Sequence, residues 1–238
     1  MSVESLYPFL YDPPSEPAGL DQVALKQVLA ELAASTRAKV AEIERLRAAV
    51  ADEHAPALVD CATAMATRFA AGARLMTFGN GGSSTDARAV AARFLAPGPG
   101  SRALPALALA DDVATLTALA NDVSFDVVFA RPLSALGRPS DIALGLSTSG
   151  GSANVLRGFA EAHRVGMLTV GLAGYDGGAM AESAARGEID FLFVMPSDSV
   201  HRIQEAQTTT YHVLWELVQI ALAESSVSGT GIGTGDPA

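Results

Sequence analysis

Residues 75–94 read LMTFGNGGSSTDARAVAARF and hold the local pattern that decides the fold of this chain. A short apolar run over 75–78 ends in Gly79-Asn80-Gly81-Gly82-Ser83, and an alanine-rich helical pattern follows. The stretch therefore predicts a strand, a tight glycine turn and the start of a helix. Such a turn directs several backbone N–H groups and a helix N-terminus at one point, which favours an anion.

A second stretch has the same organisation. Residues 142–146 are apolar, and Ser147-Thr148-Ser149-Gly150-Gly151-Ser152 follow at the start of another helical pattern. One serine at a helix start is usually an N-cap, but four hydroxyls in six residues exceed what capping requires. An isolated glycine turn would indicate only a connection, whereas two such units predict a pocket for a phosphorylated small molecule. Neither turn has the Walker A or dinucleotide spacing, so nucleotide hydrolysis and hydride transfer lack support.

Short apolar strands that alternate with helices predict a buried parallel sheet. Strands are expected at 75–78, 106–109, 142–146, 168–172 and 191–194. Helices are expected at 22–50, 55–71, 86–95, 113–120, 125–136, 153–164, 178–184 and 200–223. We expect an extended arm at 1–20, one domain over 21–224 and a disordered tail rich in glycine, serine and threonine at 225–238.

The composition narrows the class of partner. The chain has 238 residues, of which 49% are hydrophobic and 18% charged, as in globular proteins. Its net charge of −10 argues against nucleic acid and anionic membranes as partners. Cys61 is the only cysteine, so neither an intramolecular disulfide nor a cysteine metal site is expected. Without a signal-peptide pattern or an apolar run of about 20 residues, we expect a cytoplasmic location.

Several further motifs accompany the two turns, in a fixed order. They occupy residues 79–83, 86–87, 117–122, 147–150, 174–178 and 202–205. Together they resemble the SIS (sugar isomerase) domain family and, within it, the phosphoheptose (sedoheptulose 7-phosphate) isomerase branch, over about residues 23–222. The resemblance implies an α/β fold with a five-stranded parallel sheet between helices, a flavodoxin-like three-layer sandwich with N-terminal helices. It also implies a homotetramer with sites between subunits.

The resemblance assigns roles to individual residues. Counterparts of Ser83, Ser147, Thr148, Ser149 and Ser152 hold the substrate phosphate, and those of Asn80, Gly81, Gly82, Asn121, Asp122 and Gln204 surround the sugar. The reaction converts a ketose phosphate to an aldose phosphate through an enediol, which needs a base and an acid. His212 matches one of that pair. Many members also bind zinc through two residues of the helix after the first turn, together with the counterparts of Gln204 and His212.

This chain departs from the family at the centre of that site. The family reads Asp-Ala-x-His-x-x-x-Glu where this chain has Ala89 and Arg93 in place of the His and the Glu. Alanine has no ligand atom and arginine stays charged. Gln207 stands where many members carry another histidine. The remaining Gln204 and His212 fall short of the three protein ligands of a catalytic zinc, so we expect no metal and no other cofactor.

Two hypotheses about activity follow. The first is an isomerase with a substitute base, for which Glu205, Asp122, Asp86 and His201 are candidates; of these, Glu205 is taken with His212 as the catalytic pair. The second is a phosphosugar-binding protein that acts as a sensor or an assembly partner without catalysis. The kept site residues favour the first hypothesis, and the two replacements favour the second. A purely structural oligomer would leave four hydroxyls at one helix start without a purpose.

Overall fold

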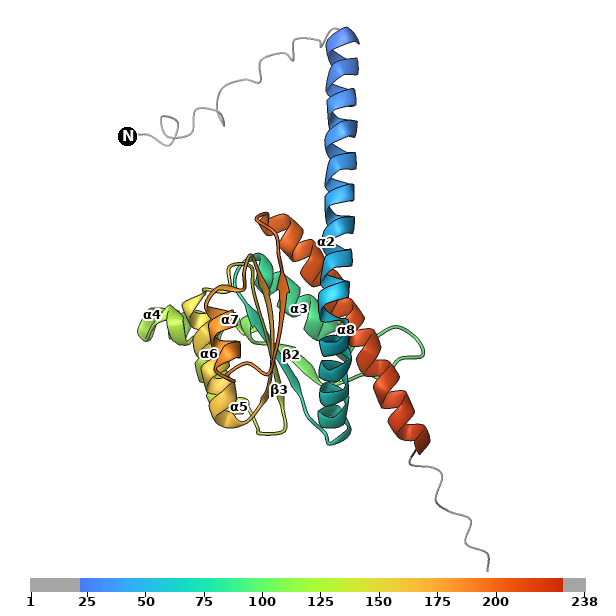
Figure 1. Ribbon diagram of the computed structural model, residues 1–238. Helices are drawn as coiled ribbons and strands as arrows, with labels where there is room; N and C mark the ends of the chain where they lie inside the picture. Colours follow the sequence, from blue (N-terminus) through green and yellow to red (C-terminus); the bar gives the residue numbers. More distant parts are fainter. Residues whose placement is uncertain (1–21, 229–238) are drawn as a thin grey trace, which may run out of the picture. The chain divides into compact units, whose positions relative to one another are not determined.

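The computed structural model describes residues 22–228 and divides the chain into two compact units, 1–42 and 43–238 (Figure 1). The described part of the first unit is the beginning of helix α2 (Gln22–Ala70). Its apolar side chains Leu25, Val28, Leu29 and Leu32 are exposed. Within residues 22–228, no helix combines the length and the apolar character needed to cross a membrane.

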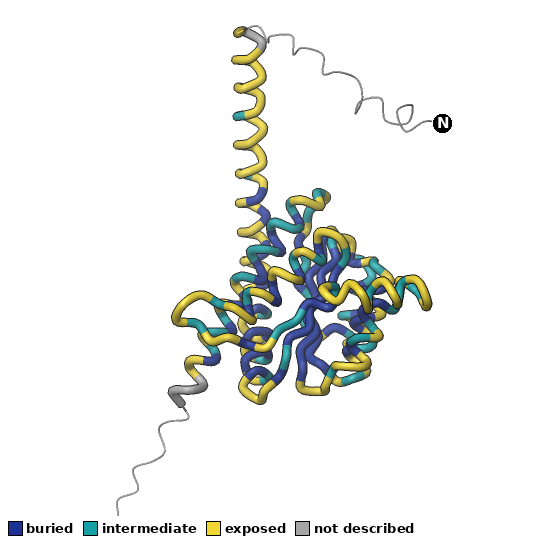
Figure 2. Tube along the Cα trace, turned by 180° about the vertical axis from the view of Figure 1, so that it is seen from behind, coloured by how far each residue is buried: buried dark blue, intermediate teal, exposed yellow. Residues whose placement is uncertain are grey.

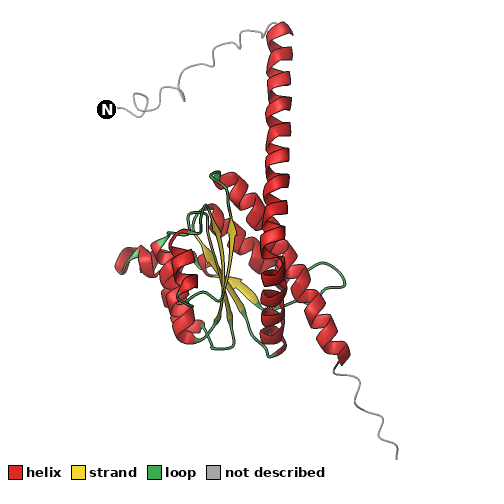
Figure 3. Cartoon of the chain, viewed as in Figure 1, coloured by secondary structure: helices red, strands yellow, loops and turns green. Residues whose placement is uncertain are grey.

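The second unit is built on a five-stranded parallel sheet of order β2-β1-β3-β4-β5, which confirms the predicted α/β class (Figure 3). The strands are β1 (Leu75–Gly79), β2 (Ala106–Ala108), β3 (Ile142–Ser147), β4 (Leu168–Gly174) and β5 (Phe191–Met195). The remaining helices are α3 (Gly82–Leu95), α4 (Val113–Asp122), α5 (Ala130–Leu136), α6 (Ala153–Val165), α7 (Gly178–Ala185) and α8 (Val200–Ser228). Two 3-10 turns occupy Leu109–Asp111 and Phe125–Val127.

Side-chain alternation along the strands divides the core into two layers. Leu75, Ile142 and Leu144 pack with the buried part of α2 and with α3 and α8. Met76 and Phe78 point to the opposite face and pack with α5 and α6. Every residue of β1, β3 and β4 is buried, as the continuous dark region of the sheet in Figure 2 shows. A strand buried on both faces explains why these stretches read as unbroken apolar runs.

Helix α2 is one continuous helix, where the sequence predicted two helices separated at 51–54. Pro56 lies inside it and removes one backbone hydrogen bond, a change that costs about 3 kcal/mol in a helix interior. The apolar side chains Ile43, Leu46, Val50 and Leu58 nevertheless keep helical spacing across the proline and are all buried. Their burial against the domain outweighs the local preference, since tertiary packing routinely overrides propensity.

Other predicted boundaries also differ from the structure, and helix α3, expected from residue 86, begins at Gly82. The helix expected at 125–136 is a 3-10 turn followed by the short helix α5, because Ser124 caps the turn through the N–H of Asp126. Helix α8 continues to Ser228, four residues into the predicted tail. The predicted arm at 1–20 and the remainder of the tail lie outside the described residues.

Candidate functional site

The two glycine-rich turns leave the sheet side by side. Strands β1 and β3 pair in parallel, and Gly79 is aligned with Leu146 at their carboxyl ends. From β1 the chain goes to β2 on one side, and it then crosses to β3 on the other side of β1. The direction of strand addition therefore reverses between β1 and β3. This switch point is where open α/β sheets bind their ligands.

A reciprocal pair of carboxamides joins the turns. Asn80 Nδ2 donates to Asn154 Oδ1 and Asn154 Nδ2 donates to Asn80 Oδ1, both at 2.8 Å. Asn154 is buried in the first turn of α6, and Asn80 lies in the turn after β1. The sequence analysis missed Asn154. The sequence did contain a signal for it: an asparagine lies near the helix start after each of the two strands, Asn80 after the first and Asn154 after the second.

The helices that follow the two turns begin without side-chain caps. Neither Gly81, before α3, nor Ser152, before α6, makes a capping hydrogen bond. Instead, Ser152 Oγ lies 3.2 Å from Ser147 Oγ, which lies 3.5 Å from Ser149 Oγ. The first N–H groups of a helix have no intrahelical acceptors. Those of Ser84 and Val155 bond to nearby carbonyl oxygens and to Asn154 Oδ1, respectively, and the N–H groups before them in each helix remain available to a ligand. Uncapped helix starts and clustered hydroxyls together suit a phosphate.

The remaining predicted phosphate residues lie in the same two turns. Thr148 is half-buried between Ser147 and Ser149. Ser83 is buried in the first turn of α3. Its carbonyl oxygen would lie 2.7 Å from a Cβ at Gly79, so only glycine lets the chain fold back so closely.

A pocket of about 380 Å³ lies where the start of α3 faces the start of α8. The side-chain amide of Gln204 occupies the space that a Cβ on Gly82 would need. The pocket lining includes three predicted site residues and four others: Gly82, Gln204 and Glu205, with Thr85, Asp86, His201 and Thr208. The structure thus brings part of the predicted sugar site together with Asp86 and His201, two of the alternative bases.

The acids of this pocket are held by neighbours. The Asp86 carboxyl receives hydrogen bonds from the side chains of Gln204 and Tyr211. Burial raises the pKa of Asp86, although these hydrogen bonds oppose the shift. Burial also raises the pKa of Tyr211, and the Asp86 charge adds to that effect. Glu205 pairs with the guanidinium of Arg202, so its carboxylate already has a partner at the pocket edge.

Arg93 does not line this pocket, although it stands in place of a residue that the resemblance puts at the centre of the site. Its guanidinium instead stacks over the ring of Trp215 on α8, with the guanidinium carbon 3.8 Å from the ring centre. The cation–π contact explains the difference, because an aromatic face attracts a guanidinium, and no ion pair within residues 22–228 engages Arg93. Trp215 is 6% exposed and lies in the hydrophobic core.

The donors at this place do not fit a metal. His212 is half-buried, stacks against Tyr211 with ring centres 5.0 Å apart, and does not line the pocket. Ala89 is exposed and offers no ligand atom. Among residues 22–228, no group of three histidine, cysteine, aspartate or glutamate side chains is arranged to hold a metal ion. The zinc site that the resemblance implies for many members therefore lacks a matching ligand set in this chain.

Asn121 and Asp122 lie apart from the pocket. Both are exposed at the end of α4, where Asn121 Nδ2 donates to Asp122 Oδ1 at 2.7 Å. Neither residue lines the pocket beside Gly82. Within one chain, the sugar-binding role expected for these two residues is not supported by a contact with that pocket.

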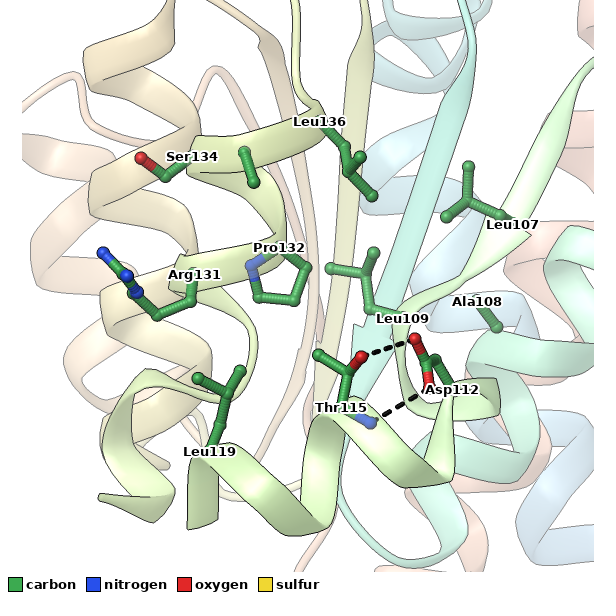
Figure 4. A pocket seen from close by; sticks show the side chains of 11 residues that line it. Leu107, Ala108, Leu109, Asp112, Thr115, Leu119, Arg131, Pro132, Ser134 and Leu136 are labelled. Atoms are coloured by element: carbon green, nitrogen blue, oxygen red, sulfur yellow. Dashed lines mark hydrogen bonds between the residues drawn. The ribbon is translucent and has the colours of Figure 1, made fainter. Parts of the chain in front are cut away.

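A larger pocket of about 660 Å³ lies between β2, α4 and α5 (Figure 4). Its lining is mostly apolar, with Leu107, Leu109 and Leu136 among the contributors. Asp112 faces Thr115 and accepts hydrogen bonds from its backbone N–H and its hydroxyl. None of the predicted site residues lines this pocket. An apolar lining of this kind does not suit a sugar phosphate.

The parallel sheet, with glycine- and serine-rich turns at its switch point, defines the chain as an α/β protein with a candidate ligand site at those turns. Comparison with known proteins is consistent with this class. The SIS domain family matches residues 40–174, and the chain belongs to that family.

Relatives and solved structures narrow the similarity further. The phosphoheptose isomerase of Aquifex aeolicus is 40% identical over 186 residues, 78% of this chain and 95% of the relative. The structure of phosphoheptose isomerase from Neisseria gonorrhoeae has a TM-score of 0.72 and 33% identity, covering 79% of this chain and 98% of that one. A phosphoheptose isomerase from Francisella tularensis gives a TM-score of 0.69 and 31% identity, over 83% and 98% of the two chains. Within the SIS family, this chain is thus similar to phosphoheptose isomerases.

The glycines of the two turns generate a testable contrast. In Gly82→Ala, the new methyl meets only the flexible end of Gln204, so we expect the free energy of unfolding to change by less than about 1 kcal/mol. Displacement of Gln204 should weaken sugar phosphate binding roughly tenfold, about the loss of one hydrogen bond. In Gly150→Ala, φ is +63° and the methyl meets the backbone carbonyl of Gly177, so a loss of about 1–3 kcal/mol or more is expected.

Gly151→Ala is the matched control, because the nearest atoms to its new methyl are 3.8 Å away or more. Urea unfolding and titration calorimetry on the three variants measure both effects. A Gly82→Ala variant with undiminished ligand affinity would contradict the placement of Gln204 in the site.

Proposed function

We propose that this chain binds a sugar phosphate at the turns after β1 and β3 and interconverts its ketose and aldose forms, as phosphoheptose isomerases do by name. One observation carries the proposal: two uncapped helix starts, joined by the Asn80–Asn154 amide pair, face a cluster of serine hydroxyls. The similarity to phosphoheptose isomerases supports a sugar phosphate over other phosphorylated ligands. Such a metabolite also fits the cytoplasmic location that we propose.

The proposed chemistry needs a proton to leave one carbon and return to its neighbour. Gln204, whose amide lies against Gly82, would bond to the sugar oxygens as the enediol forms. Glu205 and His212 are the proposed proton-transfer pair, and Asp86 is the alternative base that the pocket places beside Gln204. Each of these groups is on α3 or α8, so the contact between the two helices sets their geometry.

A second function, ligand binding without catalysis, is favoured by a different observation. The position of the family's base is Arg93, and its guanidinium is engaged with Trp215 rather than with the pocket. A protein that kept the phosphate turns and lost this base would serve as a sensor of the sugar phosphate or as an assembly partner.

Calorimetry and isotope exchange test the two functions together. With sedoheptulose 7-phosphate, we expect binding that weakens when Ser149→Ala or Ser152→Ala removes a hydroxyl, by about 1.5–3 kcal/mol for each bond to the charged phosphate. Deuterium uptake at the carbon next to the carbonyl reports base chemistry even where net turnover is slow. Ser199→Ala, outside both turns, is the control. Equal affinity for the unphosphorylated sugar overturns the phosphate site, and binding without exchange supports the sensor function.

Metal content gives an independent test. We expect protein purified without chelator to contain no stoichiometric zinc, because Ala89 and Arg93 leave too few ligands. Elemental analysis measures this, and an isomerase assay with and without added zinc accompanies it. One zinc per subunit, or turnover restored by zinc, would contradict the expectation. Restoring Ala89→His and Arg93→Glu together should create zinc affinity where Gln204 and His212 are suitably placed.

We propose a homotetramer with sites between subunits, as the resemblance implies. Leu25, Val28 and Leu29 of α2 are exposed, and helix α4 buries none of its residues within its own chain. The position of Asn121 and Asp122 outside the pocket also suits a site that a second subunit completes. Light scattering at micromolar concentration should give a multiple of the 24.4 kDa chain mass, and the monomer mass would overturn the assembly.

A further inference from the structure

Arg93 carries a charge that no acidic side chain among residues 22–228 pairs with. It is half-buried, and its guanidinium lies over Trp215. Two donors of this pair, Arg93 Nε and Trp215 Nε1, are buried without a hydrogen-bond acceptor. Among the ion pairs between residues 22 and 228, none includes Arg93. The terminal guanidinium nitrogens of Arg93 are not among the buried unpaired atoms, and arginine stays protonated, so this half-buried group can still take an anionic partner.

The stacked pair lies on the same helix–helix interface as the pocket. Asp86 and Arg93 are seven residues apart on α3, so they share a face and are separated by about 10 Å along the helix axis. Asp86 meets Gln204 and Tyr211 of α8 at the pocket, and Arg93 meets Trp215 farther along the same two helices. Ala89 lies between them on this face and is exposed, so only a methyl group occupies the intervening step.

We propose that Arg93 and Trp215 form a subsite for a second anionic group, at the end of the ligand remote from the phosphate held by the turns. The inference rests on the proposed function, because it names the substrate class of the same site. Stacking fixes the plane of the guanidinium, and its planar fork matches a carboxylate or a phosphate through two parallel bonds. The ligand class is therefore a sugar phosphate with an acid group or a second phosphate.

The subsite would place a positive side chain where the resemblance implies a metal ligand in many members. A divalent cation attracts the oxygens of a neutral sugar, whereas a fixed guanidinium attracts a negatively charged group. The chain has a net charge of −10, so an arginine without an acidic partner near the pocket makes the local electrostatic potential more positive than that of the protein as a whole. This local potential selects among anionic metabolites rather than favouring anions in general.

Trp215 is the only tryptophan of the chain, so a change in tryptophan emission on ligand addition comes from the side chain of this subsite. The full-length protein is titrated with fructose 6-phosphate, fructose 1,6-bisphosphate and 6-phosphogluconate, by fluorescence and by calorimetry. We expect the bisphosphate, the sugar acid phosphate or both to bind at least tenfold more tightly than the monophosphate and to change Trp215 emission. Which of the two does so identifies the second group as phosphate or carboxylate.

Variants of Arg93 separate the subsite from the phosphate turns. Arg93→Gln should remove the tenfold preference and the emission change, and leave fructose 6-phosphate affinity within twofold. Arg93→Lys keeps the charge without the planar fork and should reduce the preference at least threefold, which covers a failure of Arg93→Gln to fold. Arg164→Gln, an exposed arginine paired with Glu161, changes net charge equally and should have no effect.

Equal affinity of the wild-type protein for all three ligands overturns the subsite and leaves the proposed function intact. Failure of every phosphate to bind overturns both. A preference that survives Arg93→Gln unchanged also overturns the assignment to Arg93.

Discussion

The parallel pairing of β1 with β3 is the constraint on which the site depends. With Gly79 aligned to Leu146, both strands end at the same level, and the turns that follow them begin as neighbours. The turns are far apart in sequence, so only the sheet register brings them together. The Asn80–Asn154 pair then fixes the two turns to each other beyond the last strand residue. A change of register at this pair of strands would separate the serine cluster from the glycine turn.

Much of this arrangement could be predicted from the sequence. The strands of the sheet and the two turns have strong local signals, because buried parallel strands read as apolar runs and tight turns need glycine. The family resemblance added the roles expected of residues such as Gln204. Helix α2 was predicted less well, as two helices instead of one. Pro56 is visible in the local sequence, whereas the burial of Leu58 beyond it depends on tertiary packing.

The orientation of Arg93 could not be read from the sequence either. Helical spacing places residue 93 on the face that includes residues 86 and 89, but it does not decide between the pocket and the facing helix. Trp215 is more than a hundred residues away in the chain, and its ring determines the outcome. Asn154 was missed for a related reason. A single asparagine at a helix start has several ordinary uses, and its partner becomes visible only when β1 and β3 are adjacent.

The joint between the two turns has a property that follows from its chemistry. Asn80 and Asn154 are both neutral; each amide donates one bond to the other, and Asn154 Oδ1 also accepts from the Val155 N–H. Neither group gains or loses a proton over the range of pH in which the fold exists, and mobile ions do not screen a bond between two uncharged amides. The spacing of the turns is therefore insensitive to acidity and to salt. If ligand binding depends on pH or on salt, the dependence therefore comes from the ligand and from the charged residues around it, and not from the amide pair that joins the two turns.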